Sequence, residues 1–211
     1  MSEQQNNKKF AATGRSAQLR FDHKVIMGLV APKSKVLDLG CGDGTLLSQL
    51  IQEKGCHGTG IEIDEQAIYQ CVAKGLTVSH GDIDSGLADY SNKRFDYVIL
   101  HESLQQVLNP RHVILESLRV GKKVIVGIPN FCHSMARVQI FFWGRVPVTK
   151  ELPYQWYDTP NLRFLSLKDF RYFCRGEKIK ILKEVGISGN RIARFRRNLF
   201  SNVGIYLLEK Q

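Results

Sequence analysis

A buried strand that runs into a glycine-rich turn and then into a helix constrains this chain more than any other feature. Residues 36–44 read Val-Leu-Asp-Leu-Gly-Cys-Gly-Asp-Gly, and apolar residues then recur at helical spacing through residues 46–51. Alternating glycines permit a sharp turn and let a ligand approach the backbone closely. The start of the following helix should offer N–H groups to an anionic ligand. The segment therefore predicts a binding turn of the nucleotide type.

The spacing of the glycines indicates which of two kinds of ligand the turn would bind. A dinucleotide fingerprint is G-x-G-x-x-G, whereas Gly40, Gly42 and Gly44 form G-x-G-x-G with Asp38 two residues ahead. This pattern resembles motif I of the class I S-adenosylmethionine-dependent methyltransferases. Glu62 follows Gly40 by 22 residues, at the end of the next expected strand. There it could accept hydrogen bonds from both ribose hydroxyls, or it could be a solvated charge at a strand end.

Strands and helices alternate along the first 130 residues, which predicts parallel βαβ units with helices on both faces of a sheet. The sequence predicts a single α/β domain over residues 17–211, preceded by a disordered tail at 1–16. Its doubly wound, mostly parallel, seven-stranded sheet would be Rossmann-like and of the class I methyltransferase type, with an antiparallel final pair. A helix is expected at 17–30. Strands are expected at 35–39, 57–63, 76–80, 95–101, 123–128, 179–185 and 203–208.

Ligands of such sheets bind beyond the carboxyl ends of the strands, and the polar candidates gather there. Asp82 resembles the position that these methyltransferases place against the adenine amine, although it could equally be a turn residue. His101 could act as a base, but histidines in such places are often structural. The candidate cofactor-binding residues are Asp38, Gly40, Cys41, Gly42, Glu62, Ile63, Asp82, Ile83 and His101.

Residues 131–165 interrupt the alternation, and we call them the insert. They are rich in aromatic residues and contain a possible short helix near 138–142. The insert could form a lid over the cofactor site, a protein interface, or a small satellite core under a loop. The candidate substrate- or partner-binding residues are Tyr154, Trp156, Tyr157, Asp158 and Asn161.

Taken whole, the chain resembles the methionine biosynthesis protein MetW family from about Leu19 to the last strand. The glycine turn and the segments Gly60–Asp64, Gly81–Asp84 and Phe95–Leu100 match the wider methyltransferase fold. More specific are Ser103–Gln106, Ile128–Phe131 and Leu152–Asn161. The resemblance implies S-adenosylmethionine as ligand and a homoserine O-acyltransferase as partner in methionine synthesis. It does not indicate a methyl acceptor.

The amino-acid composition indicates in which cellular compartment the protein is expected and whether a metal site is expected. The chain of 211 residues has no apolar run long enough to cross a membrane and no apolar N-terminal segment typical of secretion. Its five cysteines form no C-x-x-C pair, which favours reduced thiols and a cytoplasmic protein. No Cys/His cluster has the spacing of a metal site, so no metal is expected.

The net charge of +10 is concentrated in the C-terminal part of the chain. Residues 131–211 hold 15 Lys/Arg against 6 Asp/Glu, whereas residues 1–130 hold 15 against 14. Four arginines at 191, 194, 196 and 197 form the densest group. This face could meet RNA, an acidic partner or an anionic substrate, or it could be simply solvated.

Two functions remain open from the sequence. The protein could bind S-adenosylmethionine and act through a partner acyltransferase, or it could be a working methyltransferase for a small molecule or RNA. The chain has no Asn/Asp-Pro-Pro-aromatic motif after the fourth expected strand, which disfavours methylation of the amino group of adenine or glutamine.

Overall fold

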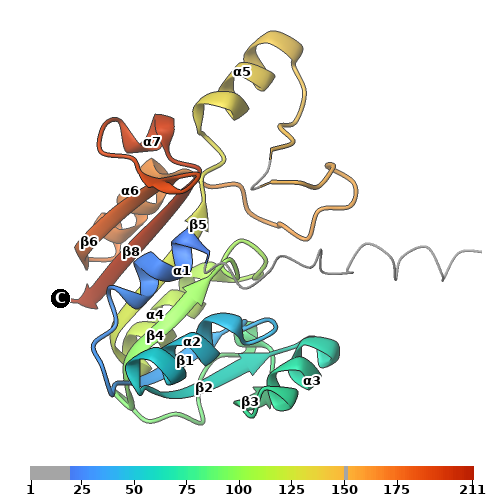
Figure 1. Ribbon diagram of the computed structural model, residues 1–211. Coiled ribbons are helices and arrows are strands. Elements are labelled where there is room, and N and C mark those ends of the chain that lie inside the picture. The colour runs from blue at the N-terminus through green and yellow to red at the C-terminus, as the bar shows by residue number, and fades with distance from the viewer. Residues whose placement is uncertain (1–19, 150–151) are drawn as a thin grey trace, which may run out of the picture.

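The computed structural model describes residues 20–149 and 152–211, which form one eight-stranded sheet flanked by helices (Figure 1). The strand order is β3-β2-β1-β4-β5-β8-β6-β7. The strands are β1 (Lys35–Leu39), β2 (His57–Glu62), β3 (Thr77–His80), β4 (Phe95–His101), β5 (Gly121–Pro129), β6 (Ile179–Ser188), β7 (Arg191–Ile192) and β8 (Val203–Lys210). The helices are α1 (Phe21–Met27), α2 (Thr45–Lys54), α3 (Glu65–Ala73), α4 (Pro110–Val120), α5 (Ser134–Trp143), α6 (Leu167–Gly176) and α7 (Arg197–Phe200), with a 3₁₀ turn η2 (Ile83–Ser85).

The first five strands are parallel, and β8 is antiparallel to both of its neighbours. The register pairs Asp38 of β1 with Gly60 of β2 on one side and with Ile99 of β4 on the other. Because parallel strands end at a common edge, the turn after β1 lies beside the ends of β2 and β4. The order places β8 between β5 and β6, which confirms the predicted methyltransferase-type sheet with an antiparallel final pair.

The core lies on both faces of the sheet, as a doubly wound fold requires. Val36 packs on one face with residues of α1 and α2, and Leu37 packs on the other with residues of α4 and α6. Successive side chains of a strand point to opposite faces, so both neighbours can be buried. The buried run Val98–Leu100 of β4 likewise contributes to both clusters.

Local sequence signals explain where most helices begin and end. Asp64 caps α3 by accepting a hydrogen bond from the Ala67 N–H, and Asn109 caps α4 immediately before Pro110. Ser166 and Asp169 form the predicted reciprocal capping box of α6. Gly55 ends α2 in the left-handed conformation that favours glycine.

Several element boundaries differ from the sequence prediction. The first helix spans Phe21–Met27, and the N-terminal part of the predicted helix and the predicted tail lie outside the described residues. An eighth strand, β7, forms a short antiparallel pair with the end of β6, which extends to Ser188. Only two residues pair in β7, too few to show alternation in the sequence.

The insert leaves the sheet after β5 and carries α5 away from the domain (Figure 1). Its two ends are joined by a hydrogen bond from the Phe131 N–H to the Leu165 carbonyl, 3.1 Å long. Phe131 and Phe164 also stack with ring centroids 4.6 Å apart. The insert is therefore a long loop whose two ends are held against each other. No helix in the described part of the chain is long and apolar enough to cross a membrane.

Candidate functional site

A cavity of about 560 Å³ opens at the carboxyl ends of β1, β2 and β4, and we call it the strand-end cavity. Ligand pockets of proteins usually measure roughly 300–1,000 Å³, so the volume suits a cofactor-sized molecule. All nine candidate cofactor-binding residues line it: Asp38, Gly40, Cys41, Gly42, Glu62, Ile63, Asp82, Ile83 and His101. The cavity is also lined by residues that no sequence pattern had indicated for it, among them Arg20, His23, Asp43, Ser103 and Gln106.

The glycine turn provides room for a ligand at one position and packs tightly at another. Gly40 has φ +71°, and a Cβ there would lie 2.8 Å from the Ser103 Cβ. Gly42 has φ +55°, but a Cβ there would meet nothing within 4 Å. Gly40 is thus required by packing as well as by conformation. The open space at Gly42 is where a ligand can approach the backbone.

Glu62 joins the end of β2 to the glycine turn. Its Oε2 accepts a hydrogen bond from the Gly42 N–H at 2.8 Å, and its Oε1 accepts from the N–H groups of Ile63 and Asp64 at 2.7 and 3.0 Å. The residue is only 9% exposed. Since a carboxylate offers about four acceptor positions, Glu62 retains room for one more donor.

Asp38 places a buried carboxylate in the cavity wall. Residue Asp38 is 3% exposed, and within residues 20–149 and 152–211 it accepts no hydrogen bond. Burial raises the pKa of Asp38 to about 7; the charge of Glu62 also raises it, whereas His101 opposes the shift. An unpartnered carboxylate in such a place is costly, and a cationic group of a ligand would stabilise it.

The start of α2 does not offer its first N–H to a ligand, contrary to the prediction from sequence. The Asp43 carboxylate accepts a hydrogen bond from the Thr45 N–H at 3.0 Å, and Lys74 pairs with the same carboxylate at 2.9 Å. The turn is therefore closed by its own acidic residue, which disfavours an anionic group at this point.

Asp82 and Ile83 form the far wall of the cavity. Asp82 caps the turn η2, with Oδ1 accepting from the Asp84 N–H at 2.9 Å. The side chain is exposed and its other carboxylate oxygen can accept a further donor. Asp82 thus combines the two alternatives of the sequence analysis, a turn residue and a cavity residue.

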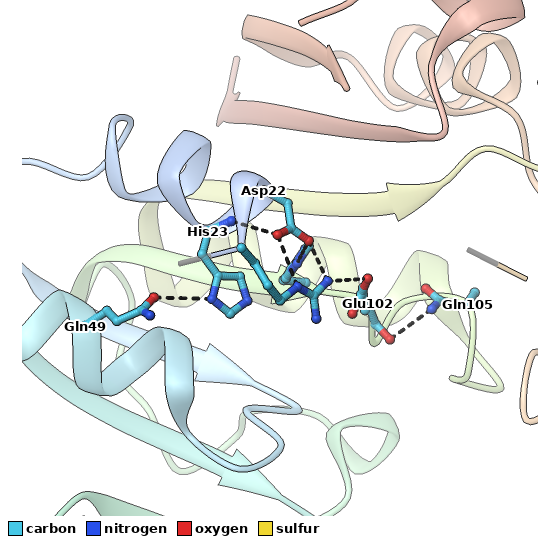
Figure 2. Close-up of polar contacts among 7 residues, drawn as sticks. Asp22, His23, Gln49, Glu102 and Gln105 are labelled. Carbon is cyan, nitrogen blue, oxygen red and sulfur yellow. Dashed lines mark hydrogen bonds and ion pairs between the residues drawn. The ribbon is translucent and has the colours of Figure 1, made fainter. Parts of the chain in front are cut away.

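His101 ends β4 and belongs to a buried polar cluster with Asp22 and His23 of α1. Figure 2 labels these two residues of α1. Nε2 of His101 is 3.0 Å from Asp22 Oδ2, and Arg20 bridges Asp22 and Glu102 at 2.5 and 2.7 Å. Nδ1 of His101 is buried without a hydrogen-bond partner in the described structure. Burial opposes ionisation of Asp22, but hydrogen bonds and charges from His101 and Arg20 hold the pKa of its carboxyl well below the ordinary range.

His23 extends this cluster toward α2. Its ring meets that of His101 edge to face at 5.6 Å, and its Nδ1 lies 3.3 Å from Gln49 Oε1. Burial lowers the pKa of His23 despite the nearby Asp22 carboxylate. The cluster could not be predicted from the sequence, because Asp22 and His101 are 79 residues apart and no local pattern links them.

The described part of the insert, residues 131–149 and 152–165, does not cover the strand-end cavity, so these residues do not form the lid expected as one alternative. None of its described residues lines the cavity. It comes near the cavity where the N–H groups of Leu162 and Arg163 bond to the Gln105 carbonyl at 2.8 and 3.1 Å.

The aromatic side chains of the insert lie largely in solvent. Tyr154, Trp156 and Tyr157 are 40%, 71% and 70% exposed, which disfavours the satellite-core alternative for them. Asp158 is exposed and binds the Gln155 N–H at 2.8 Å, and Asn161 is half-buried. The five candidate partner-binding residues therefore share a segment away from the strand-end cavity.

Solved structures with the same architecture define the class of fold. A SAM-dependent methyltransferase from Thermotoga maritima matches with a TM-score of 0.63 and 17% identity, covering 90% of this chain and 87% of that one. The [4+2]-cyclase SpnF matches with a TM-score of 0.65 and 17% identity, over 89% and 80%. The protein thus has the class I S-adenosylmethionine-dependent methyltransferase fold.

The sequence comparison is more specific. Residues 20–208 match the family described as methionine biosynthesis protein MetW, and the chain belongs to that family. A bifunctional methionine biosynthesis protein MetXA/MetW from Rhodopirellula baltica is 33% identical over 176 residues, 79% of this chain and 28% of the relative. A ubiquinone biosynthesis O-methyltransferase from Idiomarina loihiensis is 32% identical over 114 residues, 46% of this chain and 42% of the relative. The chain thus spans less than half the length of these relatives.

Proposed function

We propose that the protein binds S-adenosylmethionine in the strand-end cavity and acts in methionine synthesis together with a homoserine O-acyltransferase. The observation that carries the first part is the Asp38 carboxylate, which is buried in the cavity wall and accepts no hydrogen bond from the described residues. S-adenosylmethionine supplies an ammonium group that would pair with it. It also supplies the electrophilic methyl group needed if transfer occurs.

The remaining polar groups fit the other parts of this ligand. Glu62 would accept a hydrogen bond from a ribose hydroxyl at its remaining acceptor position, and Asp82 would accept one from the adenine amine. Binding both ribose hydroxyls would require Glu62 to release one of its three backbone N–H donors. The space at Gly42 leaves room for close approach of the ligand.

The second part of the proposal rests on the family and on the exposed insert. One relative combines MetXA and MetW in a single bifunctional protein, which supports a functional association between the two activities. Trp156 and Tyr157 present large exposed rings 5.6 Å apart, and aromatic residues of this kind are enriched at protein interfaces. The insert is therefore the surface that we assign to the acyltransferase.

The experiment measures association between the purified chain and the homoserine O-acyltransferase of the same organism, together with acyltransferase activity. Trp156→Ala should weaken association by at least about tenfold if the ring is an interface hot spot. Tyr172→Ala is the matched control, because Tyr172 is 76% exposed on α6, outside the insert. Equal effects of the two variants, or no association of the unaltered chain, would refute the assignment.

The alternative function is methyl transfer to a small molecule or RNA. It is favoured by the similarity to ubiquinone biosynthesis O-methyltransferases and by the exposed side chains of Arg191, Arg194 and Arg196. His101 stays the candidate base, although Nε2 faces Asp22 and Nδ1 is buried. Transfer of labelled methyl groups from S-adenosylmethionine to phenolic compounds or RNA, lost in Glu62→Ala, would support this alternative over a purely binding role.

A further inference from the structure

We propose that Asp22, His23 and His101 form a binding site for a divalent transition-metal ion beside the strand-end cavity. Each residue offers one ligand atom, and these atoms all lie within 4.8 Å of one another. Two imidazoles and one carboxylate are a donor set that zinc, iron and related ions accept. The site was not expected from the sequence, because its residues lack the spacing of a local metal motif.

The fold brings the three ligands together from two elements. Asp22 and His23 are neighbours on α1 (Figure 2), and His101 ends β4. All three are well buried: residues Asp22 and His23 are 8% and 6% exposed, and the His101 side chain is 6% exposed. Packing of α1 against the sheet therefore fixes the ligands before any ion arrives.

The contacts around His23 orient it for coordination. Its Nδ1 lies 3.3 Å from Gln49 Oε1, and an amide oxygen can only accept a hydrogen bond. Nδ1 therefore carries the proton, and Nε2 keeps a lone pair for a metal. Metal-binding histidines commonly hold their second ring nitrogen in this way.

The contacts around Asp22 hold its carboxylate in place. Arg20 donates to both carboxylate oxygens at 3.2 and 2.5 Å, and Glu102 in turn neutralises Arg20 at 2.7 Å. With both histidines neutral, as metal binding requires, the two carboxylates outnumber the single guanidinium and the cluster carries negative charge. Hydrogen bonds to a ligating carboxylate are a usual feature of metal sites.

The site has an open side toward the cavity. His23 and His101 both line the strand-end cavity, and three protein ligands leave at least one coordination position vacant in a four-coordinate ion. A ligand with an anionic oxygen, such as a carboxylate or an ionised hydroxyl, would fill that position. The ion would thus add a recognition point for an oxygen-bearing compound beside the proposed cofactor.

The competing account is a simple ion pair without metal. Nε2 of His101 and Oδ2 of Asp22 are 3.0 Å apart, a distance at which an Nε2–H group donates a hydrogen bond to the carboxylate. Coordination through Nε2 requires this proton to move to Nδ1 of the same ring or to solvent. The two accounts therefore differ in whether an added ion displaces the proton, which a titration with metal can decide.

The experiment uses tag-free full chain, stripped with a chelator and dialysed, titrated with Zn²⁺ by calorimetry and with Co²⁺ by visible absorption. We expect one ion per chain and cobalt bands typical of a low coordination number. His23→Ala should weaken Zn²⁺ binding by more than about 100-fold, and Gln49→Leu by about 10–100-fold, because loss of an orienting partner alone has the latter effect. His57→Ala is the matched control. His57 is exposed at the start of β2, at the amino ends of the parallel strands and thus far from the carboxyl ends that form the cavity.

Circular dichroism establishes that each variant is folded. If His23→Ala is not, Asp22→Asn serves in its place, because it removes the charge of the ligand and keeps its shape. No stoichiometric Zn²⁺ binding at micromolar concentration would overturn the proposal in favour of the ion pair. Binding that survives both Asp22→Asn and His23→Ala would overturn it as well, because the ion would then have other ligands.

Discussion

The Oε2 atom of Glu62 accepts a hydrogen bond from the backbone N–H of Gly42 at 2.8 Å, which ties the second strand to the turn that follows the first. The carboxylate also holds the N–H groups of Ile63 and Asp64. One side chain thus shapes two walls of the strand-end cavity. Its loss should affect both the shape of the empty cavity and its affinity for ligand.

Replacing Glu62 by Ala should therefore weaken S-adenosylmethionine binding by roughly 10–100-fold, because a hydrogen bond to a charged group contributes about 1.5–3 kcal/mol. It should also lower the free energy of unfolding by about 1–3 kcal/mol, since three partly buried backbone donors lose their acceptor. Calorimetry and urea unfolding measure the two effects. Glu53→Ala, an exposed position near the end of α2, is the control and should change neither. Unchanged affinity in Glu62→Ala would remove this residue from the site.

Asp38 should make the stability of the ligand-free protein depend on pH. Burial raises its pKa from 3.8 to about 7, so the folded state binds the proton more tightly than the unfolded state does. The stability from this group is fully present below pH 3.8 and is lost as pH rises to about 7. A shift of this size corresponds to about 4 kcal/mol at most.

Asp38→Asn should abolish this part of the pH dependence and raise the unfolding free energy above pH 7 relative to the unaltered chain. Urea unfolding at a series of pH values between 4 and 8 measures it. Parallel curves for the two proteins over that range would show that Asp38 does not titrate as described.

Alanine substitutions at three glycines with positive φ distinguish the cost of backbone strain from the loss of ligand contact. Gly42 and Gly75 have φ +55° and +72°, and a Cβ at either meets nothing within 4 Å, but only Gly42 lines the cavity. Ala at either position should cost about 1–2 kcal/mol of stability from the left-handed conformation. Gly42→Ala alone should weaken ligand binding. Gly40→Ala should be more destabilising than both, because its Cβ would overlap Ser103. Equal ligand affinities of the Gly42 and Gly75 variants would contradict a close approach at Gly42.

The exposed rings of α5 should contribute little to stability. Phe141 and Phe142 are 81% and 70% exposed, so replacing both by Ser should change the unfolding free energy by no more than about 0.5 kcal/mol each. Leu152, which is 7% exposed, gives the contrast: Leu152→Ala should cost about 2–5 kcal/mol. Thermal or urea unfolding of the purified variants tests both. A large loss in the Phe variants would mean that these rings pack against a part of the fold.

The sequence predicted the elements whose signals are local. The glycine turn, the Asn109-Pro110 start of α4 and the Ser166–Asp169 capping box each fix a boundary within a few residues, and the structure has them there. Alternation of strands and helices predicted the sheet. Ligands of such sheets bind beyond the carboxyl ends of the strands, and the nine candidate residues chosen on that basis all line one cavity.

The missed features depend on contacts between distant residues or on unusual caps. Helix α5 begins earlier than expected because His133 caps it, with Nδ1 accepting from the Ala136 N–H at 3.3 Å, and histidine is not a common cap. The Asp22–His101 pair joins two elements that no periodicity connects. The exposure of the insert could not be predicted from the sequence either, because aromatic residues occur both in cores and at interfaces.

We propose that the strand-end cavity recognises both ends of S-adenosylmethionine. The most direct measurement is calorimetric titration of the unaltered chain and of Asp38→Asn with S-adenosylmethionine and with methylthioadenosine, which lacks the amino acid portion. We predict micromolar binding of S-adenosylmethionine to the unaltered chain, a loss of at least about tenfold in Asp38→Asn, and little change for methylthioadenosine. Absence of binding at millimolar ligand, or equal losses for the two ligands, would contradict the account.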